Sequence, residues 1–294
     1  MKIQERPLGD LRITRAVEMI MEFDPLKFFP DTSAAQWDEH RHWLQPRAMN
    51  PENSALLLPC QSYIVKTSHH TVLIDSCVGN HKSHPRHPAW HQRSDSSYPD
   101  ALAAHGLQAT DIDFVMCTHL HGDHIGWNTR LQDGRWVPTF PNARYIFSAT
   151  DLQSWQDSEQ SKLAMQPIQE SVLPVIAAGQ ATLVEDSFSL DDEIWLQPTP
   201  GHTPGHLAIN LASRGQRAIV LGDMVHSPIQ CLYPEWTVQA DWNDELARKT
   251  RRQMMAHLAE TQTLALTAHF PLPSAGWFRN RGSAFSFEYD TLPW

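Results

Sequence analysis

The chain has 294 residues, of which 41% are hydrophobic and 19% are charged, and this composition is typical of one large globular domain or two small ones. The formal net charge of −10 at pH 7 argues against a protein that follows nucleic-acid phosphates, because such proteins normally present a basic face. The 4 cysteines are scattered and form no CxxC pair, which argues against a disulfide framework or a thiolate zinc site.

The start of the sequence is charged and polar, and no apolar segment of the signal-peptide kind follows it. No stretch approaches the roughly 18 apolar residues of a membrane span. We therefore expect a soluble, cytoplasmic protein with no membrane partner and no nucleic-acid partner. A secreted form whose leader has been removed would have the same sequence features.

Residues 1–59 are expected to form an irregular N-terminal extension, because they are rich in proline and aromatic side chains. Ser33 is placed to cap a short helix over 34–44. The aromatic side chains have two interpretations: they roof a substrate cleft, or they fill core or a dimer contact. The side chains concerned are Phe28, Phe29, Trp37 and Trp43.

From residue 60 onward, predicted strands alternate with predicted helices. The strands are expected at 62–66, 71–75, 114–117, 194–197, 207–211, 218–221 and 264–267, the first two as a hairpin. The helices are expected at 99–105, over 149–177 with a break near Pro167, and from a cap at Asn243 to residue 260. Strands interleaved with helices predict an α/β layered domain.

The most informative stretch directly follows the predicted strand 114–117 and holds three histidines and one aspartate within six residues. These candidate ligands are His119, His121, Asp123 and His124. Desolvating so many polar groups together is costly unless something binds them. Imidazole nitrogens and carboxylate oxygens are the ligands that a divalent ion such as zinc prefers, so the stretch predicts a metal site.

Three further candidate ligands lie just beyond predicted strands in the second half of the chain. His202 lies in a turn rich in proline and glycine, Asp223 ends the strand 218–221, and His269 ends the strand 264–267. Any one of them alone would more often be structural. Together with the first cluster they favour a two-metal site in which Asp223 bridges the ions.

The pattern His-X-His-X-Asp-His, followed by His202, Asp223 and His269, resembles the metallo-β-lactamase superfamily of metallo-hydrolases over about residues 60–272. The resemblance implies that 60–294 form the hydrolase domain, an αββα sandwich with the metals in a cleft along one edge of two sheets. It also implies the ligand assignment: His119, His121 and His202 for one ion, Asp123, His124 and His269 for the other, and Asp223 between them.

The implied cofactors are two divalent ions per chain. Zinc is the first expectation, with manganese, iron or cobalt as alternatives, because histidine and aspartate do not discriminate strongly among them. A hydroxide shared by two ions about 3.5–4 Å apart is expected to be the nucleophile, and Asp123 is expected to help orient it. Asp75 and His206 are expected to support the ligands without binding metal.

The residues around Asp223 narrow the substrate class. Zinc β-lactamases place a cysteine at this position, so the aspartate disfavours antibiotic hydrolysis. The overall spacing resembles the branch that contains acyl-homoserine lactonases and methyl parathion hydrolase. The best-known lactonases carry a tyrosine three residues after the bridging aspartate, whereas this chain carries His226, which is closer to the organophosphate-hydrolase pattern. His226 donates a hydrogen bond to a developing oxyanion, assists the leaving group as an acid, or only packs beside the metal.

The expected function is that of a dinuclear hydrolase that opens a lactone of the acyl-homoserine-lactone kind, as in quorum quenching, or cleaves an ester of a small molecule. An organophosphate or aryl-ester hydrolase is the first alternative, and a catalytically silent metal-binding protein is the second. A homodimer joined through the N-terminal segment is implied by the resemblance only. The loop 81–91 holds four histidines and is expected to be a flap over the site or plain surface.

Overall fold

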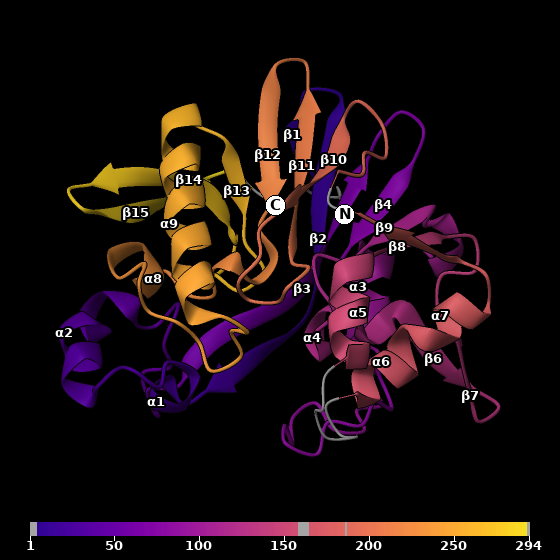
Figure 1. The fold of residues 1–294 in the computed structure, drawn as a ribbon, viewed down its shortest axis with the longest axis horizontal. Helices are drawn as coiled ribbons and strands as arrows, with labels where there is room; N and C mark the ends of the chain where they lie inside the picture. Colours follow the sequence, from indigo (N-terminus) through magenta and orange to yellow (C-terminus); the bar gives the residue numbers. More distant parts are fainter. Residues whose placement is uncertain (1–4, 158–164, 186, 293–294) are drawn as a thin grey trace. The chain divides into compact units, whose positions relative to one another are not determined.

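The computed structural model describes residues 5–157, 165–185 and 187–292 (Figure 1). Within these ranges the chain divides into two compact units. Unit 1 takes residues 5–19 and 60–188, and unit 2 takes 20–59 and 189–292. These units do not coincide with the predicted division into 1–59 and 60–294. That the hydrolase domain begins at residue 60 stays a prediction.

Residues 1–59 were expected to be irregular, and this expectation is wrong for their first half. The segment contains β1 (Arg6–Leu8) and the 13-residue strand β2 (Leu11–Phe23), which pair in antiparallel register. Charged side chains such as Arg12 and Glu22 alternate with buried apolar ones along β2. Alternation of this kind is the pattern of a strand with one buried face, and the density of charges obscures it.

The first sheet has the strand order β1-β2-β3-β4-β5-β8-β9. Its antiparallel hairpin of β3 and β4 is confirmed, and β4, β5, β8 and β9 run parallel. The apolar runs of β4 and β5 are buried throughout their centres, as expected of parallel strands covered on both faces. The bounds are β3 (Leu56–Lys66), β4 (Thr71–Ile74), β5 (Phe114–Met116), β8 (Arg144–Ser148) and β9 (Ala181–Val184).

Several helices and one small hairpin complete unit 1. The helices are α3 (Ser97–Ala104), α4 (Gly122–Ile125), α5 (Ala149–Asp157), α6 (Gln166–Ser171) and α7 (Leu173–Ala177), and the hairpin pairs β6 (Thr129–Gln132) with β7 (Arg135–Pro138). The helix predicted over 149–177 is thus divided into three. Pro167 lies in the first turn of α6 and so begins a helix there instead of interrupting one, and 158–164 lie outside the described residues.

The second sheet belongs to unit 2 and has the strand order β10-β11-β12-β13-β14-β15. Only β12 and β13 pair in parallel, and the other neighbours are antiparallel. The last hairpin, β14 with β15, was not predicted. The bounds are β10 (Ile194–Pro198), β11 (Leu207–Ser213), β12 (Gln216–Val220), β13 (Leu264–Leu266), β14 (Ala275–Arg281) and β15 (Ala284–Tyr289).

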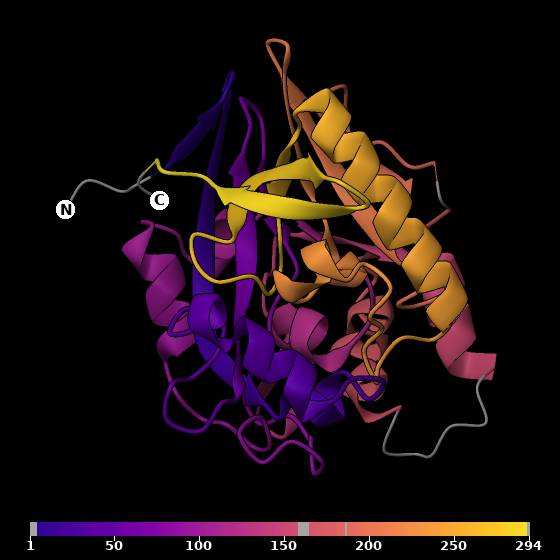
Figure 2. The ribbon, with the colours of Figure 1, turned by 90° about the vertical axis from the view of Figure 1, so that its left-hand side faces the viewer.

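Helix α9 (Asp244–Thr261) packs along this sheet, as Figure 2 shows. The predicted cap is confirmed, because the Asn243 side chain accepts a hydrogen bond from the Leu246 amide at 2.9 Å. Met254, Met255 and Leu258 project from one face of α9 into a buried cluster with residues of β12 to β15. Among the described residues, no helix combines the length and apolar character that a bilayer span requires.

The segment 24–59 adds α1 (Pro25–Phe28) and α2 (Ala34–Leu44) to unit 2. The predicted start of α2 is confirmed by a capping box between Ser33 and Gln36. Phe29 and Trp37 are buried and pack against Trp236, which follows α8 (Ile229–Leu232). These two aromatic side chains therefore belong to the core of unit 2, while Trp43 is 37% exposed.

Within each unit, chemistry-bearing residues follow the ends of parallel strands. Asp75 follows β4 and His119 follows β5 shortly after its end, and these strands are parallel neighbours in unit 1. Asp223 follows β12 and His269 follows β13, the parallel pair of unit 2. Because parallel neighbours end at the same edge of a sheet, each pair of loops is brought together by the strand order.

The loop 81–91 is mostly exposed, and two of its buried side chains, Lys82 and His84, attach it to the rest of unit 1. Lys82 is 1% exposed, and its ammonium donates to the Thr129 hydroxyl at 2.5 Å and to the Glu170 carbonyl at 3.1 Å. His84 is 8% exposed, and a Cβ placed on Gly122 would lie 2.6 Å from its Cε1. The loop is thus anchored by Lys82 and covers the start of α4 with His84.

We predict that His84 makes the stability of the metal-free protein depend on pH. Burial lowers the pKa of His84 to about 4, and the charge of Asp123 offsets only part of that effect. The unfolded chain binds a proton near pH 6.5 and the folded chain near pH 4, so stability is lost as pH falls between these values. The loss would reach at most about 3 kcal/mol.

Urea unfolding of wild type and of His84→Phe at pH 7.5 and pH 4.5 measures this contribution. The free energy of unfolding of the variant should fall less than that of wild type over this interval. His69→Phe, at an exposed position in the turn between β3 and β4, is the matched control and should follow wild type. Equal pH dependence in wild type and His84→Phe would show that His84 does not titrate in this way.

Candidate metal centre

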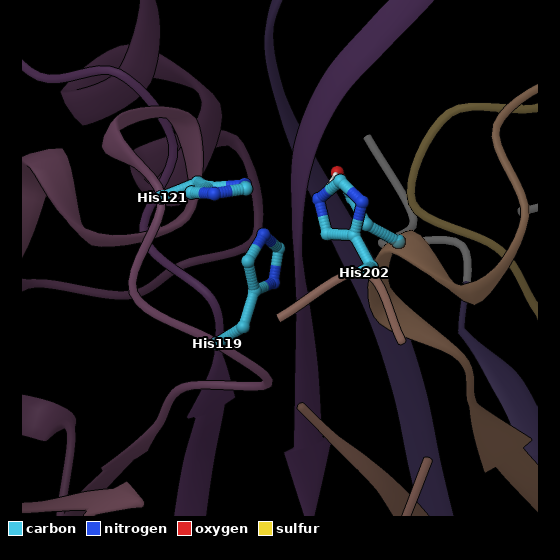
Figure 3. Close-up of side chains that lie close together, drawn as sticks. His119, His121 and His202 are labelled. Atoms are coloured by element: carbon cyan, nitrogen blue, oxygen red, sulfur yellow. Dashed lines mark ion pairs between the residues drawn. The ribbon is translucent and has the colours of Figure 1, made fainter. Parts of the chain in front are cut away.

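The first group of predicted ligands lies in unit 1, on the loop that follows β5 and in the short helix α4. His119 and His124 are 1% and 2% exposed. The ring centroid of His119 lies 4.7 Å from that of His121 and 4.1 Å from that of His124. Figure 3 shows the rings of His119 and His121 on this loop. The Nε2 atom of His124 lies 3.7 Å from Oδ2 of Asp123. Four potential ligands are therefore gathered by six residues of chain.

Asp75 fixes this loop from the end of β4. Its Oδ1 accepts a hydrogen bond from the Thr118 amide at 2.7 Å, and its Oδ2 lies 2.9 Å from Nδ1 of His124. The Leu120 amide donates to the buried carboxylate of Asp151 at 2.8 Å. Asp75 thus holds both the backbone of the loop and one imidazole, which fits the supporting role expected for it.

The second group lies in unit 2, around the carboxylate of Asp223. Oδ1 of Asp223 lies 3.0 Å from Nε2 of His269, and Oδ2 lies 3.3 Å from Nε2 of His202 and 3.1 Å from Nε2 of His226. All four side chains are buried, with exposed fractions of 2–4%. The two oxygens of Asp223 therefore face His269 and His202 separately, the two histidines that the family resemblance assigns to different ions.

The tautomers of three histidines are consistent with a ligand role. Nδ1 of His202 bonds to Oδ1 of Asp241 at 2.7 Å, and Nδ1 of His269 bonds to the Pro59 carbonyl at 2.8 Å, both within unit 2. In unit 1, Nδ1 of His124 bonds to Asp75. Because Nδ1 donates to an acceptor in each case, Nε2 is the nitrogen left to bind a metal ion, which takes the place of any proton on that atom.

His206 differs from these histidines because both of its nitrogens serve the protein. Its Nε2 accepts a hydrogen bond from the Asp223 amide at 3.0 Å, and its Nδ1 lies 2.7 Å from the Thr199 hydroxyl. A ring used on both sides has no lone pair to offer. His206 therefore positions the backbone of Asp223, which is the supporting role expected from the sequence.

The pKa values within unit 2 follow from this geometry. Burial lowers the pKa of His202, but the hydrogen bonds to Asp223 and Asp241 outweigh burial and raise it to about 9. Burial likewise lowers the pKa of His226, and there the attraction of Asp223 does not restore it. Without a metal ion His202 is held as a cation between two carboxylates, so a divalent ion would replace a proton at this position.

Asp241 and Arg251 were not predicted to contribute to the site. The Asp241 side chain is fully buried between His202 and Arg251, and its carboxylate lies 3.5 Å from Nη2 of Arg251. Asp241 lies 39 residues from His202 and follows no strand, so its position gives no signal. The sequence does carry a signal for Arg251. It lies on the same helix face as Ala247, Met254 and Met255, where a charged side chain is unexpected.

His226 lies beside an aromatic side chain of the N-terminal segment. The ring of Phe28 meets that of His226 edge to face at 5.4 Å, and His226 stacks on His269 at 5.7 Å. Phe28 is half-buried, unlike Phe29, which is fully buried. Of the four aromatic side chains singled out in the sequence, Phe28 is therefore the one that contacts a predicted site residue.

The chemistry of each group fits a divalent metal ion. Unit 1 supplies imidazoles and a carboxylate from one loop, and unit 2 supplies two imidazoles whose Nε2 atoms face a buried carboxylate. Such clustering of imidazole and carboxylate donors, with His124, His202 and His269 each fixed by a hydrogen bond at Nδ1, is characteristic of zinc sites. All four cysteines are buried free thiols, so none is paired in a disulfide.

Known proteins of similar sequence fall in one family. Residues 55–263 match the family model of the metallo-beta-lactamase superfamily. The uncharacterized protein YobT of Bacillus subtilis (strain 168) is 25% identical over 213 residues, which are 69% of this chain and 80% of that protein. An N-acyl homoserine lactonase of a Bacillus species is 25% identical over 116 residues, which are 40% of this chain and 39% of that enzyme.

Solved structures extend the similarity over the whole fold. AidC, a dizinc quorum-quenching lactonase solved with a product, covers 99% of this chain and 98% of its own, with 20% identity and a TM-score of 0.83. The hydrolase AbOPH of the beta-lactamase superfamily has the same coverage, 99% and 98%, with 23% identity and a TM-score of 0.84. The α/β fold expected from the sequence is therefore confirmed, and the chain belongs to the metallo-β-lactamase superfamily of hydrolases.

Proposed function

We propose that the chain is a dinuclear metal-dependent hydrolase that opens a lactone of the acyl-homoserine-lactone kind. The observation that supports it most is the setting of Asp223, whose two oxygens face His269 and His202 separately. A carboxylate with one oxygen toward each of two imidazoles is suited to bridge two ions. Buried carboxylate and imidazoles without a cation between them would be costly to desolvate.

The proposed ligand sets are those implied by the family resemblance. One ion would take three histidines, the other would take two histidines and one aspartate, and Asp223 would contribute to both. The sets are His119, His121 and His202 for the first ion and Asp123, His124 and His269 for the second. Zinc is the proposed native ion, with manganese, iron and cobalt compatible with the same donors.

Bound ions of this kind would lower the pKa of a shared water and polarise the scissile carbonyl. The protein's own residues would do the rest. Asp123 is partly exposed, so its carboxylate is available to orient a water. Burial lowers the pKa of His226, so its ring is neutral at pH 7 and carries one N–H, which lies 3.1 Å from Oδ2 of Asp223. With the Asp223 oxygens bound to metal, this N–H would be available to donate a hydrogen bond to an oxygen that gains negative charge.

Two considerations support a lactone over other esters. Of the proteins compared above, one sequence relative and one structural neighbour are lactonases by name. In addition, Phe28 places an apolar ring against His226, where the chain of an acyl substrate would find an apolar contact. The substrate proposed is therefore a small lactone with an apolar chain.

One residue favours a second candidate function, the hydrolysis of organophosphates or aryl esters. The position three residues after Asp223 carries His226 and not the tyrosine of the best-known lactonases. A neutral imidazole can serve a phosphoryl oxygen as well as a carbonyl oxygen. The two functions would share all the proposed metal ligands and differ in the substrate that fits around His226.

We predict that the purified protein binds two divalent ions per chain and hydrolyses acyl-homoserine lactones. Metal analysis and a panel of lactone, phosphotriester, thioester and β-lactam substrates measure both properties. In His121→Ala, metal content should fall and hydrolysis should be lost, since an imidazole ligand is removed. Good turnover of phosphotriesters without lactone hydrolysis would favour the second function, and protein without bound metal would indicate a silent binding protein.

We also predict that His226 acts on the substrate and not on the metal. In His226→Phe, kcat for the best lactone should fall by about 10²–10³-fold because one oxyanion donor is lost. Metal content should be unchanged, since His226 is outside the proposed ligand sets. His226→Gln keeps a donor and should retain more activity than His226→Phe. A loss of metal in His226→Phe would assign His226 to the metal instead.

A further inference from the structure

A single buried arginine of unit 2 is connected, directly or through one or two hydrogen-bonded groups, to three of the site residues of that unit. Arg251 lies on α9, is 1% exposed and faces the sheet together with the apolar side chains of that helix. Burying a guanidinium is costly unless its donors are satisfied. Its hydrogen bonds therefore show what the protein gains from having a charge at this position.

The guanidinium donates in three directions. Nε donates to the Met224 carbonyl at 3.0 Å, and Nη1 donates to the carbonyls of Pro234 and Trp236, each at 2.9 Å. Nη2 reaches Oδ2 of Asp241 at 3.5 Å. Most of its hydrogen bonds thus go to loop carbonyls, and the one ion pair is long.

Two of these contacts connect Arg251 to proposed metal ligands. Met224 directly follows Asp223, so the bond to its carbonyl fixes the backbone at the bridging carboxylate. Asp241 accepts from Nδ1 of His202 at 2.7 Å through its other oxygen, Oδ1. Asp241 therefore transmits the position of Arg251 to the imidazole of His202.

A third contact leads to His226. The Trp236 carbonyl that accepts from Arg251 also accepts from Nε2 of Gln230 at 2.9 Å. Oε1 of Gln230 in turn accepts from the His226 amide at 2.8 Å. The backbone of His226 is thus connected to Arg251 through one carbonyl and one amide side chain.

We propose that Arg251 is a positioning residue that aligns Asp223, His202 and His226, with Asp241 as its link to His202. The inference rests on the proposed function, because it takes these three residues as parts of a metal and substrate site. A methionine would fill the same place on the apolar face of α9 at lower desolvation cost. The buried charge is therefore explained by the loops it joins.

Zinc affinity of the full chain tests the proposal, measured by competition with a chromophoric chelator. In Arg251→Met and in Asp241→Asn, the dissociation constant for zinc should rise about 10–100-fold, as is typical when partners of metal ligands are removed. Arg251→Lys should recover only part of the affinity, because an ammonium cannot reach all of these acceptors at once. Kd values equal to wild type in folded Arg251→Met would overturn the proposal.

Arg252→Met is the matched control, one residue along α9. Arg252 is exposed and contacts only Glu235 and the Ser283 carbonyl in the part of the chain that the structure describes, so its substitution should leave zinc affinity unchanged. Near-ultraviolet circular dichroism establishes that each variant is folded. If Arg251→Met does not fold, Arg251→Lys and Asp241→Asn decide the question, since zinc affinities equal to wild type in both would overturn the proposal.

A double-mutant cycle separates a shared pathway from two independent effects. The double variant combines Arg251→Met and Asp241→Asn. If Arg251 acts on His202 through Asp241, its dissociation constant for zinc should be close to that of the single variant with the larger loss of affinity. Fully additive losses would contradict the link. The outcome is also distinct from that of the proposed function: a wild type that binds zinc but opens no lactone refutes the substrate and leaves the affinity comparison valid.

Discussion

The structure of unit 2 depends on one interaction, the contact between the Asp223 carboxylate and the imidazoles of His202, His226 and His269. Four polar side chains lie there with exposed fractions of 2–4%. In a buried environment such a group is stable only if charge and hydrogen bonds are balanced. A proton on His202 provides part of the balance in the metal-free chain, and the proposed divalent ions would provide it more completely.

The fold brings these side chains together by a simple rule. Parallel neighbours β12 and β13 end at the same edge of their sheet, and the loops after them carry Asp223 and His269. The backbone around Asp223 is fixed by two side chains outside the proposed ligand sets: His206 at the Asp223 amide, and Arg251 at the Met224 carbonyl. Unit 1 repeats the arrangement on a smaller scale, with Asp75 after β4 holding the loop after β5.

Much of this could be predicted from the sequence, because its signals are local. Six residues starting at His119 predict a metal-binding loop, and a polar residue just after an apolar run predicts the strand ends near Asp223 and His269. The strands β1 and β2 were missed because charges occupy alternate positions of a half-buried strand. Asp241 was missed because its partner His202 lies 39 residues away and only the folded loops bring them together.

Phe28 and the loop 81–91 show a second kind of limit. Composition suggested a cleft roof or core for the aromatic residues, and the structure divides them, with Phe29 buried and Phe28 against His226. The histidines of 81–91 suggested a flap or plain surface; most of the loop is exposed, and the sequence does not indicate that Lys82 anchors it through neutral acceptors and the Trp136 ring. Tertiary packing decides which of these side chains are buried. In irregular segments, hydrophobic periodicity does not indicate burial.

We propose, above all, that Asp223 is shared by two metal ions. X-ray absorption spectroscopy of the zinc-loaded protein tests it most directly, because scattering between two metals reports their separation. We predict a metal–metal distance of about 3.5–4 Å in wild type and its loss in Asp223→Ala. A spectrum of wild type with nitrogen and oxygen neighbours only, and no second metal, would contradict it.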